Sequence, residues 1–446
     1  MDKVDVGLRM RWGAWIGFTA GLVFVTLSWE SAPSIAHTQE GAVANRLPQI
    51  RALEKNRPDL GSQQRSASNA KATNNDSDEW SIPARSLDLD LAEEIDGKLV
   101  QTLNDGTELT YTVNPALQKK ATDILRYYRV EYGTVVAMNP KTGEILAMAE
   151  HAEGRPELNG LALQAEGPAA SIFKLITAAA LVEEGGLNAK SEICTHGGRR
   201  GLSLKLLRDN PKRDKTCHTM AQAMGSSNNV AFGRWAVRNL EPSVLETTAD
   251  RFLFNQRIPF VFGVAMSRAN VPVSSELGLA KTAAGFQGTT LSPLHAALLA
   301  SSVANDGVIM VPRLVASAAR GDKELYRKKD QTLARVMKSS TADQLREMML
   351  ETTKQEGSAG RFFNKKKRRK WRQRIPGLSV AGKTGSLSAR NVGATQYYSW
   401  FVSTAPAEDS EIAIAALVVN GDVWTVKGAA VAAQLLEFWN DKVRSK

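Results

Sequence analysis

Segments typical of β-strands lie at both ends of the folded part of this chain, and helical patterns dominate the sequence between them. Helical spacing of apolar residues recurs from 171 to about 355. The strand-like runs cover 98–112, 133–149, 378–386, 397–404 and 411–419. Strands need neighbours that satisfy their backbone groups, so the order predicts an antiparallel sheet built from both ends and flanked by helices. The expected fold class is α/β of the α+β type, with an all-helical lobe.

The N-terminus contains an apolar run, residues 12–29, that has 18 residues and no charge. This length meets the minimum for a membrane-spanning helix. Lys3, Arg9 and Arg11 precede the run, which predicts a cytoplasmic N-terminus by the positive-inside rule. The alternative is a cleaved signal peptide with a cleavage site at 34–36. In both interpretations the rest of the chain lies outside the cytoplasm.

Residues 30–86 have the composition of a flexible linker. They are rich in Ser, Ala, Asn, Gln and charge, and their large apolar residues follow no pattern. Such a segment buries too little apolar surface to fold alone. We therefore expect a cytoplasmic tip and transmembrane anchor over 1–29, a linker over 30–86 and one folded domain over 87–446.

A single segment, 365–374, supplies eight of the positive charges in a chain of net charge +11. The sequence favours a solvated loop over two alternatives, which are contact with an anionic wall polymer or lipid headgroups and contact with nucleic acid. Because the excess is confined to one short run, no nucleic-acid partner is expected.

The chain has two cysteines, Cys194 and Cys217. In an exported protein they can form a disulfide, although two free thiols are also compatible with the sequence. A metal site with the adjacent His196 and His218 is a third alternative, but the spacing matches no common zinc pattern. No bound metal is expected.

Three short strings carry candidate chemistry, and the first is Ser171-Ile172-Phe173-Lys174. A serine hydroxyl is a weak nucleophile that needs a base within hydrogen-bonding reach. Lys174 is three positions after Ser171, so both side chains share a helical face. A partly desolvated lysine beside another cation has a lowered pKa and can act as that base. Alone, this tetrapeptide is more often a helix cap and a surface lysine.

The second string is Ser226-Ser227-Asn228. Ser226 is a candidate for passing a proton to a leaving nitrogen, and Asn228 can bind a peptide amide through its carbonyl and NH₂ groups. The frame Ser227-Asn228-Asn229 is the alternative. Alone, the string is more often a polar helix turn.

The third string, Lys383-Thr384-Gly385-Ser386, ends a predicted strand. Lys383 is a candidate for the cation near Lys174, and with the hydroxyls of Thr384 and Ser386 it can bind a substrate carboxylate. Gly385 allows a ligand to approach the strand closely. The backbone N–H groups of Ser171 and Ser386 are candidates for an oxyanion hole.

The ordered strings resemble those of the transpeptidase domain of penicillin-binding proteins, the serine enzymes that cross-link peptidoglycan. The resemblance covers roughly 110–440 and includes 112–118, 135–148, Asn159, 285–294 and 304–307. Lys383 follows Asn228 by 155 residues, a distance that resembles these proteins more than the compact β-lactamases. Ala170 and Ser386 depart from the glycine and threonine more common in the family. Nothing resembles the glycosyltransferase domain of bifunctional members.

The resemblance implies a membrane-anchored DD-transpeptidase facing the extracytoplasmic space. Ser171 would attack a D-Ala-D-Ala stem peptide, Lys174 would be the base, and β-lactams would acylate Ser171. The resemblance implies no cofactor, and it suggests a separate glycosyltransferase as a possible partner. The alternatives are a DD-carboxypeptidase, a β-lactam sensor or β-lactamase of the same fold, and a non-catalytic cell-wall scaffold.

Overall fold

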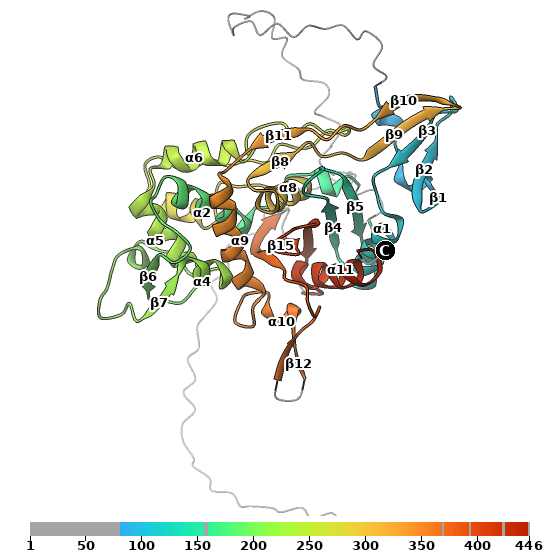
Figure 1. The fold of residues 1–446 in the computed structure, drawn as a ribbon. Helices are drawn as coiled ribbons and strands as arrows, with labels where there is room; N and C mark the ends of the chain where they lie inside the picture. Colours follow the sequence, from blue (N-terminus) through green and yellow to red (C-terminus); the bar gives the residue numbers. More distant parts are fainter. Residues whose placement is uncertain (1–80, 156–158, 368–369, 392–393, 422–423, 445–446) are drawn as a thin grey trace, which may run out of the picture. The chain divides into compact units, whose positions relative to one another are not determined.

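The central sheet joins strands from both ends of the folded part of the chain, as the sequence predicts (Figure 1). In the computed structural model the strand order is β14-β15-β16-β4-β5, and each neighbouring pair is antiparallel. The strands are β4 (Tyr132–Met138), β5 (Ile145–Ala152), β14 (Ala381–Asn391), β15 (Ala394–Ala405) and β16 (Ile412–Asn420). Every residue of β16 is buried, because packed layers cover both faces of the sheet. This topology places β14 at an open edge.

The structure describes residues 81–155, 159–367, 370–391, 394–421 and 424–444. These residues belong to one compact unit, Asn74–Lys446. The predicted anchor at 12–29 and nearly all of the predicted linker lie outside the described residues. Within the described ranges, no helix has both the length and the apolarity required to span a membrane.

Helices cover the two faces of the sheet. One face packs against α1 (Pro115–Tyr127) and α11 (Gly428–Lys442), and α8 (Pro293–Ala304) packs on the other. Asn114 caps α1 by accepting a hydrogen bond from the Leu117 N–H, and proline occupies the first helical position.

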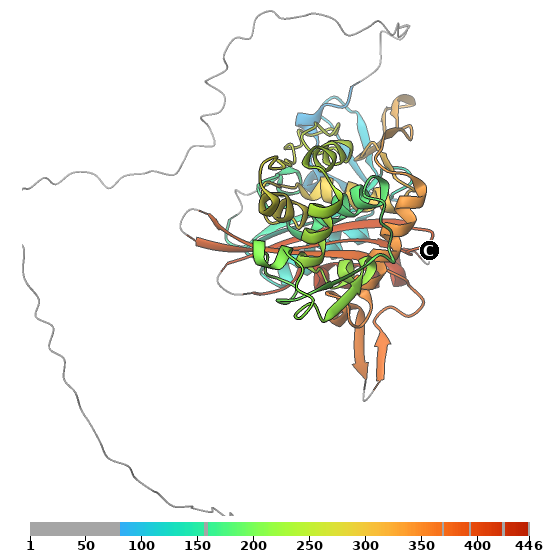
Figure 2. The ribbon, with the colours of Figure 1, turned by 90° about the vertical axis from the view of Figure 1, so that its left-hand side faces the viewer.

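A helical lobe lies beside the sheet and contains the first two candidate strings (Figure 2). Its helices include η5 (Ala170–Phe173), α2 (Lys174–Glu183), α3 (Leu204–Leu207), α4 (Met220–Gly225), α5 (Asn229–Asn239), α6 (Pro242–Arg251), α7 (Glu276–Ala283) and α9 (Ser339–Thr353). Residues 220–239 form two helices and not one continuous helix, because Ser227 has a φ of 57° and Asn228 caps α5. The resulting turn positions part of the candidate site.

A second five-stranded sheet has the order β1-β2-β3-β9-β10. Its strands are β1 (Glu93–Ile95), β2 (Lys98–Thr102), β3 (Glu108–Tyr111), β9 (Val315–Arg320) and β10 (Lys323–Arg327). The strand-like run predicted at 98–112 forms a hairpin, since β2 and β3 pair antiparallel across a turn at Gly106. The predicted helix-rich region also contains β9 and β10, together with a ladder of β8 (Val308–Met310) and β11 (Thr332–Arg335). These strands are too short to establish a clear period in the sequence.

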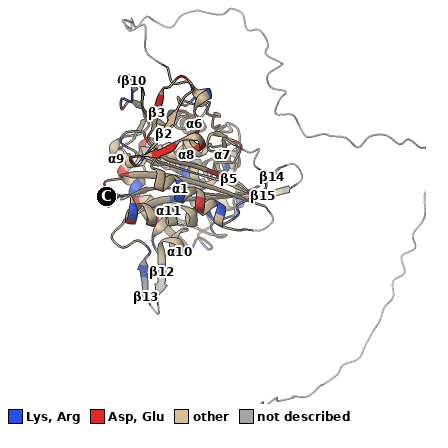
Figure 3. Ribbon diagram, turned by 90° about the vertical axis from the view of Figure 1, so that its right-hand side faces the viewer, with Lys and Arg blue, Asp and Glu red and all other residues tan. Residues whose placement is uncertain are grey.

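The basic segment forms a β-hairpin where the sequence predicts a solvated loop, and its side chains Lys365 and Arg372 are exposed. It consists of β12 (Asn364–Lys367) and β13 (Lys370–Gln373), which are paired antiparallel. Figure 3 shows the hairpin extending away from α10 (Gly360–Phe363). Glu437 of α11 forms ion pairs with Lys365 at 3.5 Å and Arg374 at 2.7 Å, which fixes the base of the hairpin.

The two cysteines form a disulfide. Cys194 in β6 (Glu192–Thr195) faces Cys217 in β7 (Thr216–Thr219), and the two strands pair antiparallel. The disulfide alternative therefore holds in the structure, and the free-thiol and metal-site alternatives for these cysteines do not.

Candidate active site

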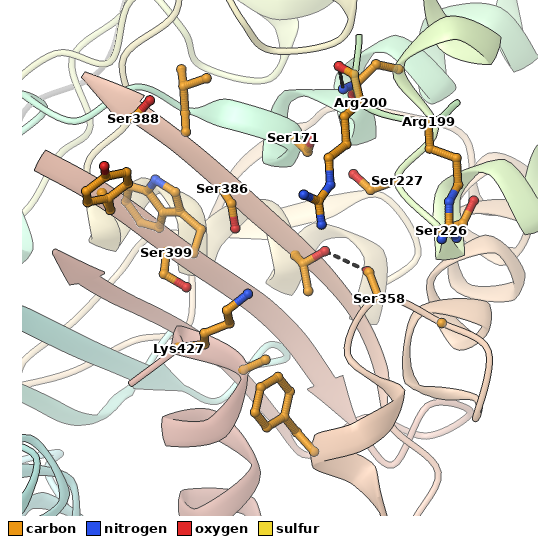
Figure 4. Close-up of a pocket in the computed structure, with 18 of the residues that line it drawn as sticks. Ser171, Arg199, Arg200, Ser226, Ser227, Ser358, Ser386, Ser388, Ser399 and Lys427 are labelled. Carbon is orange, nitrogen blue, oxygen red and sulfur yellow. Dashed lines mark hydrogen bonds between the residues drawn. The ribbon is translucent and has the colours of Figure 1, made fainter. Parts of the chain in front are cut away.

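Ser171 lies in η5, one turn before Lys174, on the wall of a pocket of about 650 Å³ (Figure 4). The Nζ atom of Lys174 is 2.8 Å from the Oγ atom of Ser171, in hydrogen-bonding contact. Their spacing in the sequence leads to this contact because the chain continues from η5 directly into α2. A serine hydroxyl and a lysine amine are therefore in direct contact.

Lys174 is completely buried and has three hydrogen-bond partners. Besides Ser171, its Nζ atom donates to Asn229 Oδ1 at 2.8 Å and to the Ala284 carbonyl at 2.7 Å. None of these partners carries a negative charge. Burial, and secondly the positive charge of Lys383, holds the pKa of Lys174 well below its usual value. A lysine in this environment loses its own proton at a lower pH than an exposed lysine does, which suits it to accept a proton from a hydroxyl.

In the second string, the structure brings Ser227 and Asn229 to the lysines, and not Ser226 and Asn228. The Nζ atom of Lys383 donates to Ser227 Oγ at 2.9 Å, and Asn229 accepts from Lys174. The Ser226 hydroxyl donates instead to the Gln222 carbonyl. The Asn228 side chain accepts from the Ala231 N–H. The hydrogen bonds to the two lysines therefore follow the alternative frame, which lies one residue later than the preferred frame.

The left-handed turn at Ser227 is the physical reason for this shift. It ends α4 and turns the next side chains relative to a continuous helix. Asn228 then occupies the N-cap of α5, where its side-chain oxygen satisfies a helix N–H. An asparagine directly before an apolar helical pattern was the signal that could have identified this capping role.

The third string lies on the edge strand β14. Lys383 is fully buried, and it donates to Ser227 Oγ and to the Thr384 carbonyl at 2.7 Å. Burial lowers the pKa of Lys383 to about 7. The Thr384 hydroxyl shares a hydrogen bond of 2.7 Å with the hydroxyl of Ser358. No sequence motif identifies Ser358 as part of this site. Ser386 is exposed on the pocket wall.

Close backbone packing fixes the segment that precedes Ser171. Ala170 has a φ of 48°, and the residue opposite it is Gly285. A Cβ atom on Gly285 would lie 1.8 Å from the Ala170 carbonyl oxygen, so only glycine fits there. On the other side, a Cβ atom on Gly385 would lie 3.2 Å from Ile172. The indole N–H of Trp400 donates to the Pro168 carbonyl at 2.9 Å, which ties this segment to the sheet.

The pocket also contains residues that no sequence motif identified. Arg199 and Arg200 come from the loop between β6 and α3, and Lys427 comes from the N-cap of α11. Glu356, Tyr397 and Trp424 also line it. Arg199 and Arg200 follow two glycines in a loop with no periodic pattern, so no sequence signal indicates that they line the same pocket as Ser171. Within the described ranges, no cluster of residues suited to holding a metal ion is found.

Comparison with known proteins assigns this chain to a family. Residues 133–437 match the penicillin-binding protein transpeptidase domain. The chain is 28% identical over 366 residues to the peptidoglycan D,D-transpeptidase PbpA of Mycobacterium tuberculosis, covering 74% of this chain and 71% of the relative. It is 26% identical over 370 residues to PbpA of Mycolicibacterium smegmatis, with 74% and 71% covered.

Solved structures support the same assignment. The ceftriaxone acyl-enzyme complex of penicillin-binding protein A from M. tuberculosis superimposes with a TM-score of 0.59 at 26% identity, covering 75% of this chain and 80% of that one. The D,D-transpeptidase domain of a peptidoglycan glycosyltransferase from Eggerthella lenta gives a TM-score of 0.60 at 27% identity, covering 76% and 84%. The chain therefore belongs to the family of penicillin-binding protein transpeptidase domains.

Proposed function

We propose that this protein is a peptidoglycan D,D-transpeptidase that acts through an acyl-enzyme on Ser171. The observation that carries the proposal is the 2.8 Å contact between Ser171 Oγ and the buried amine of Lys174. The names of the PbpA relatives support the reaction type. The acyl-enzyme complexes of the structural neighbour support covalent reaction with β-lactams.

In acylation, neutral Lys174 accepts the proton of the Ser171 hydroxyl as Oγ attacks the carbonyl carbon of the penultimate D-Ala. The N–H groups of Ser171 and Ser386 would stabilise the oxyanion. Ser227, held by Lys383, passes a proton to the leaving nitrogen, and the terminal D-Ala departs. The products of this half-reaction are an ester on Ser171 and free D-Ala.

In deacylation, an amine from a neighbouring stem peptide attacks the ester carbonyl. The amine loses one proton, Ser171 Oγ regains one, and a new peptide bond replaces the ester. The donor bond and the product bond are both amides, so the step needs no external energy source. If water attacks instead, the same ester yields a carboxypeptidase product.

The proposed setting is the outer side of a membrane. The apolar run 12–29 supports an uncleaved anchor, and the linker that follows would hold the catalytic domain away from the bilayer. The proposal also includes a separate glycosyltransferase that supplies the glycan strands.

The test uses the purified chain with a synthetic pentapeptide ending in D-Ala-D-Ala and an added amino-acid acceptor. We expect mass spectrometry to show free D-Ala and a peptide joined to the acceptor. Ser171→Ala should abolish both products, while the exposed control Ser203→Ala should form both at the wild-type rate. Hydrolysed peptide alone would identify a carboxypeptidase, and a folded wild-type chain that forms no product would support the scaffold alternative.

A further inference from the structure

The positive charge of Lys383 is not directed into the cleft. Its ammonium is fully buried, and its hydrogen bonds go to Ser227 and to the Thr384 carbonyl. Thr384 already shares a hydrogen bond with Ser358. The free group of the string is then the exposed hydroxyl of Ser386, which is neutral. A carboxylate binds most strongly to donors that are themselves charged, so the cleft needs another cation if it is to hold one.

Arg200 and Lys427 are two cations that the cleft offers. Both line the pocket that contains Ser171, and Figure 4 shows both side chains pointing into it. Within the described part of the chain, neither side chain has an ion pair or a hydrogen bond. The Lys427 ammonium lies 5.0 Å from the centre of the Trp424 ring. Glu356 is the acidic residue among those that line the pocket, and it is exposed.

The loop that carries Arg200 is tied directly to the catalytic residues. Asn229 donates from its side chain to the Arg200 carbonyl at 2.8 Å, and its side-chain oxygen accepts from Lys174. Its backbone N–H donates to the Arg199 carbonyl. One buried residue therefore positions the base and the cation together. Arg200 is exposed at its tip but anchored at its backbone.

Lys427 is also held in place, at the N-cap of the 15-residue helix α11. The next N–H, of Gly428, donates to the Ser399 hydroxyl at 3.1 Å. Ser399 pairs with Ser386 across β14 and β15. The lysine therefore sits next to the strand position that carries the free hydroxyl. The positive end of the helix dipole adds to the attraction for an anion there.

The positive charges around this position are not neutralised. Burial, and then the charges of Arg361 and Arg200, lowers the pKa of Lys427. A bound anion would reduce the repulsion between Lys427 and these two arginines. Arg199 has a different setting, because it lies beside Ser226 in Figure 4, and its charge, after burial, lowers the pKa of His218.

We propose that Arg200 and Lys427 supply the charge that binds the C-terminal carboxylate of the acyl donor, with Ser386 as the neutral donor between them. The inference rests on the proposed function, and it assigns substrate binding to two residues outside the three strings. Lys383 then serves Ser227 and the proton path, and it does not bind the carboxylate.

The test compares two acyl donors on the full chain. One is the benzoyl-D-alanyl thioester of thioglycolate, which ends in a carboxylate, and the other is the matching thioglycolamide, which ends in a neutral amide. Thiol release gives kcat/KM for each donor. The variants are Arg200→Gln, Lys427→Gln and the double variant, with the charge-retaining Arg200→Lys for rescue. Lys205→Gln is the control, since Lys205 is an exposed cation of the same lobe that does not line this pocket.

We expect each single Gln variant to lower kcat/KM for the carboxylate donor about tenfold, with little effect on the amide donor. Arg200→Lys should recover most of the loss, and Lys205→Gln should match wild type. Higher ionic strength should slow the wild type with the carboxylate donor more than it slows the double variant. Equal losses on both donors, or no loss on the carboxylate donor, would overturn the inference. A wild-type chain that turns over neither donor would instead contradict the proposed function.

Discussion

The side-chain oxygen of Asn229 lies 2.8 Å from the Nζ atom of Lys174. This contact joins the start of α5 to the start of α2, two helices whose first residues are 55 positions apart in the sequence. Because Asn229 also donates to the Arg200 carbonyl, it links the proposed base to the loop that faces the cleft. The geometry of the site therefore depends strongly on a residue that is one position away from the expected one.

The shifted frame makes a direct prediction. Ser227→Ala and Asn229→Ala should each slow acylation by penicillin about a hundredfold, because they remove the contacts to Lys383 and Lys174. Ser226→Ala should leave the rate near wild type, since its hydroxyl bonds to the Gln222 carbonyl. Stopped-flow measurement with a fluorescent penicillin gives the rates. A larger loss for Ser226→Ala than for Ser227→Ala would contradict the assignment.

Asn228 is expected to affect stability and not acylation. Its side chain caps α5, so Asn228→Ala should lower the free energy of unfolding by about 1 kcal/mol. The acylation rate of the folded variant should stay within about twofold of wild type, because Asn228 does not line the pocket. Urea titration and acylation rates on the same preparation separate the two effects. Unchanged stability with lost acylation would show that Asn228 belongs to the site.

Lys174→Met tests the base. Methionine keeps an apolar side chain of similar length but removes the amine, so acylation should fall by about 10²–10⁴. Lys190→Met, at an exposed position, is the matched control. Acylation by the wild type should also be lost as the pH falls through the lowered pKa of Lys174, because the protonated amine cannot accept the serine proton. A variant with wild-type rate would exclude Lys174 as the base.

Lys383 gives a prediction for stability against pH. Its pKa is about 7 in the folded chain and about 10.5 when exposed, so the unfolded chain holds one more proton between these values. The free energy of unfolding should therefore rise with pH in this window, and the burial penalty should be fully present below pH 7. Lys383→Met removes the contribution of this lysine to the pH dependence of the free energy of unfolding. Between pH 8 and 10, the free energy of unfolding should therefore rise less steeply with pH in Lys383→Met than in the wild type, by about 1.4 kcal/mol per pH unit. Urea unfolding that gives equal slopes would show that the lysine is not buried in the neutral form.

Ala170 occupies a backbone conformation that favours glycine. The φ of Ala170 is 48°, a value that costs less for glycine than for alanine. Ala170→Gly should therefore raise the free energy of unfolding by up to about 1 kcal/mol without loss of acylation. The neighbouring Ala169 has a φ of −62°, so Ala169→Gly should have the opposite sign and lower stability by roughly 0.5–1 kcal/mol. Thermal unfolding measures both. A destabilised Ala170→Gly variant would mean that the packing of the buried Ala170 methyl group outweighs the backbone strain.

The sequence was sufficient for the central sheet, because apolar runs at 133–149 and 397–419 leave few other partners for one another. It was also sufficient for Ser171 and Lys174, whose contact spans one helical turn. It failed where the backbone leaves a regular pattern. The left-handed turn at Ser227 changed which asparagine reaches Lys174. Lys427 and Arg200 come from segments without periodicity, so only the folded chain brings them to the cleft.

The central claim is that Ser171 is the nucleophile of the cleft. The most direct measurement is mass spectrometry of peptides from the purified chain after incubation with benzylpenicillin. We predict one added penicilloyl group, located on the peptide that contains Ser171 and absent from a folded Ser171→Ala variant. An adduct that persists in that variant, or a wild-type chain that gains no mass, would contradict the account.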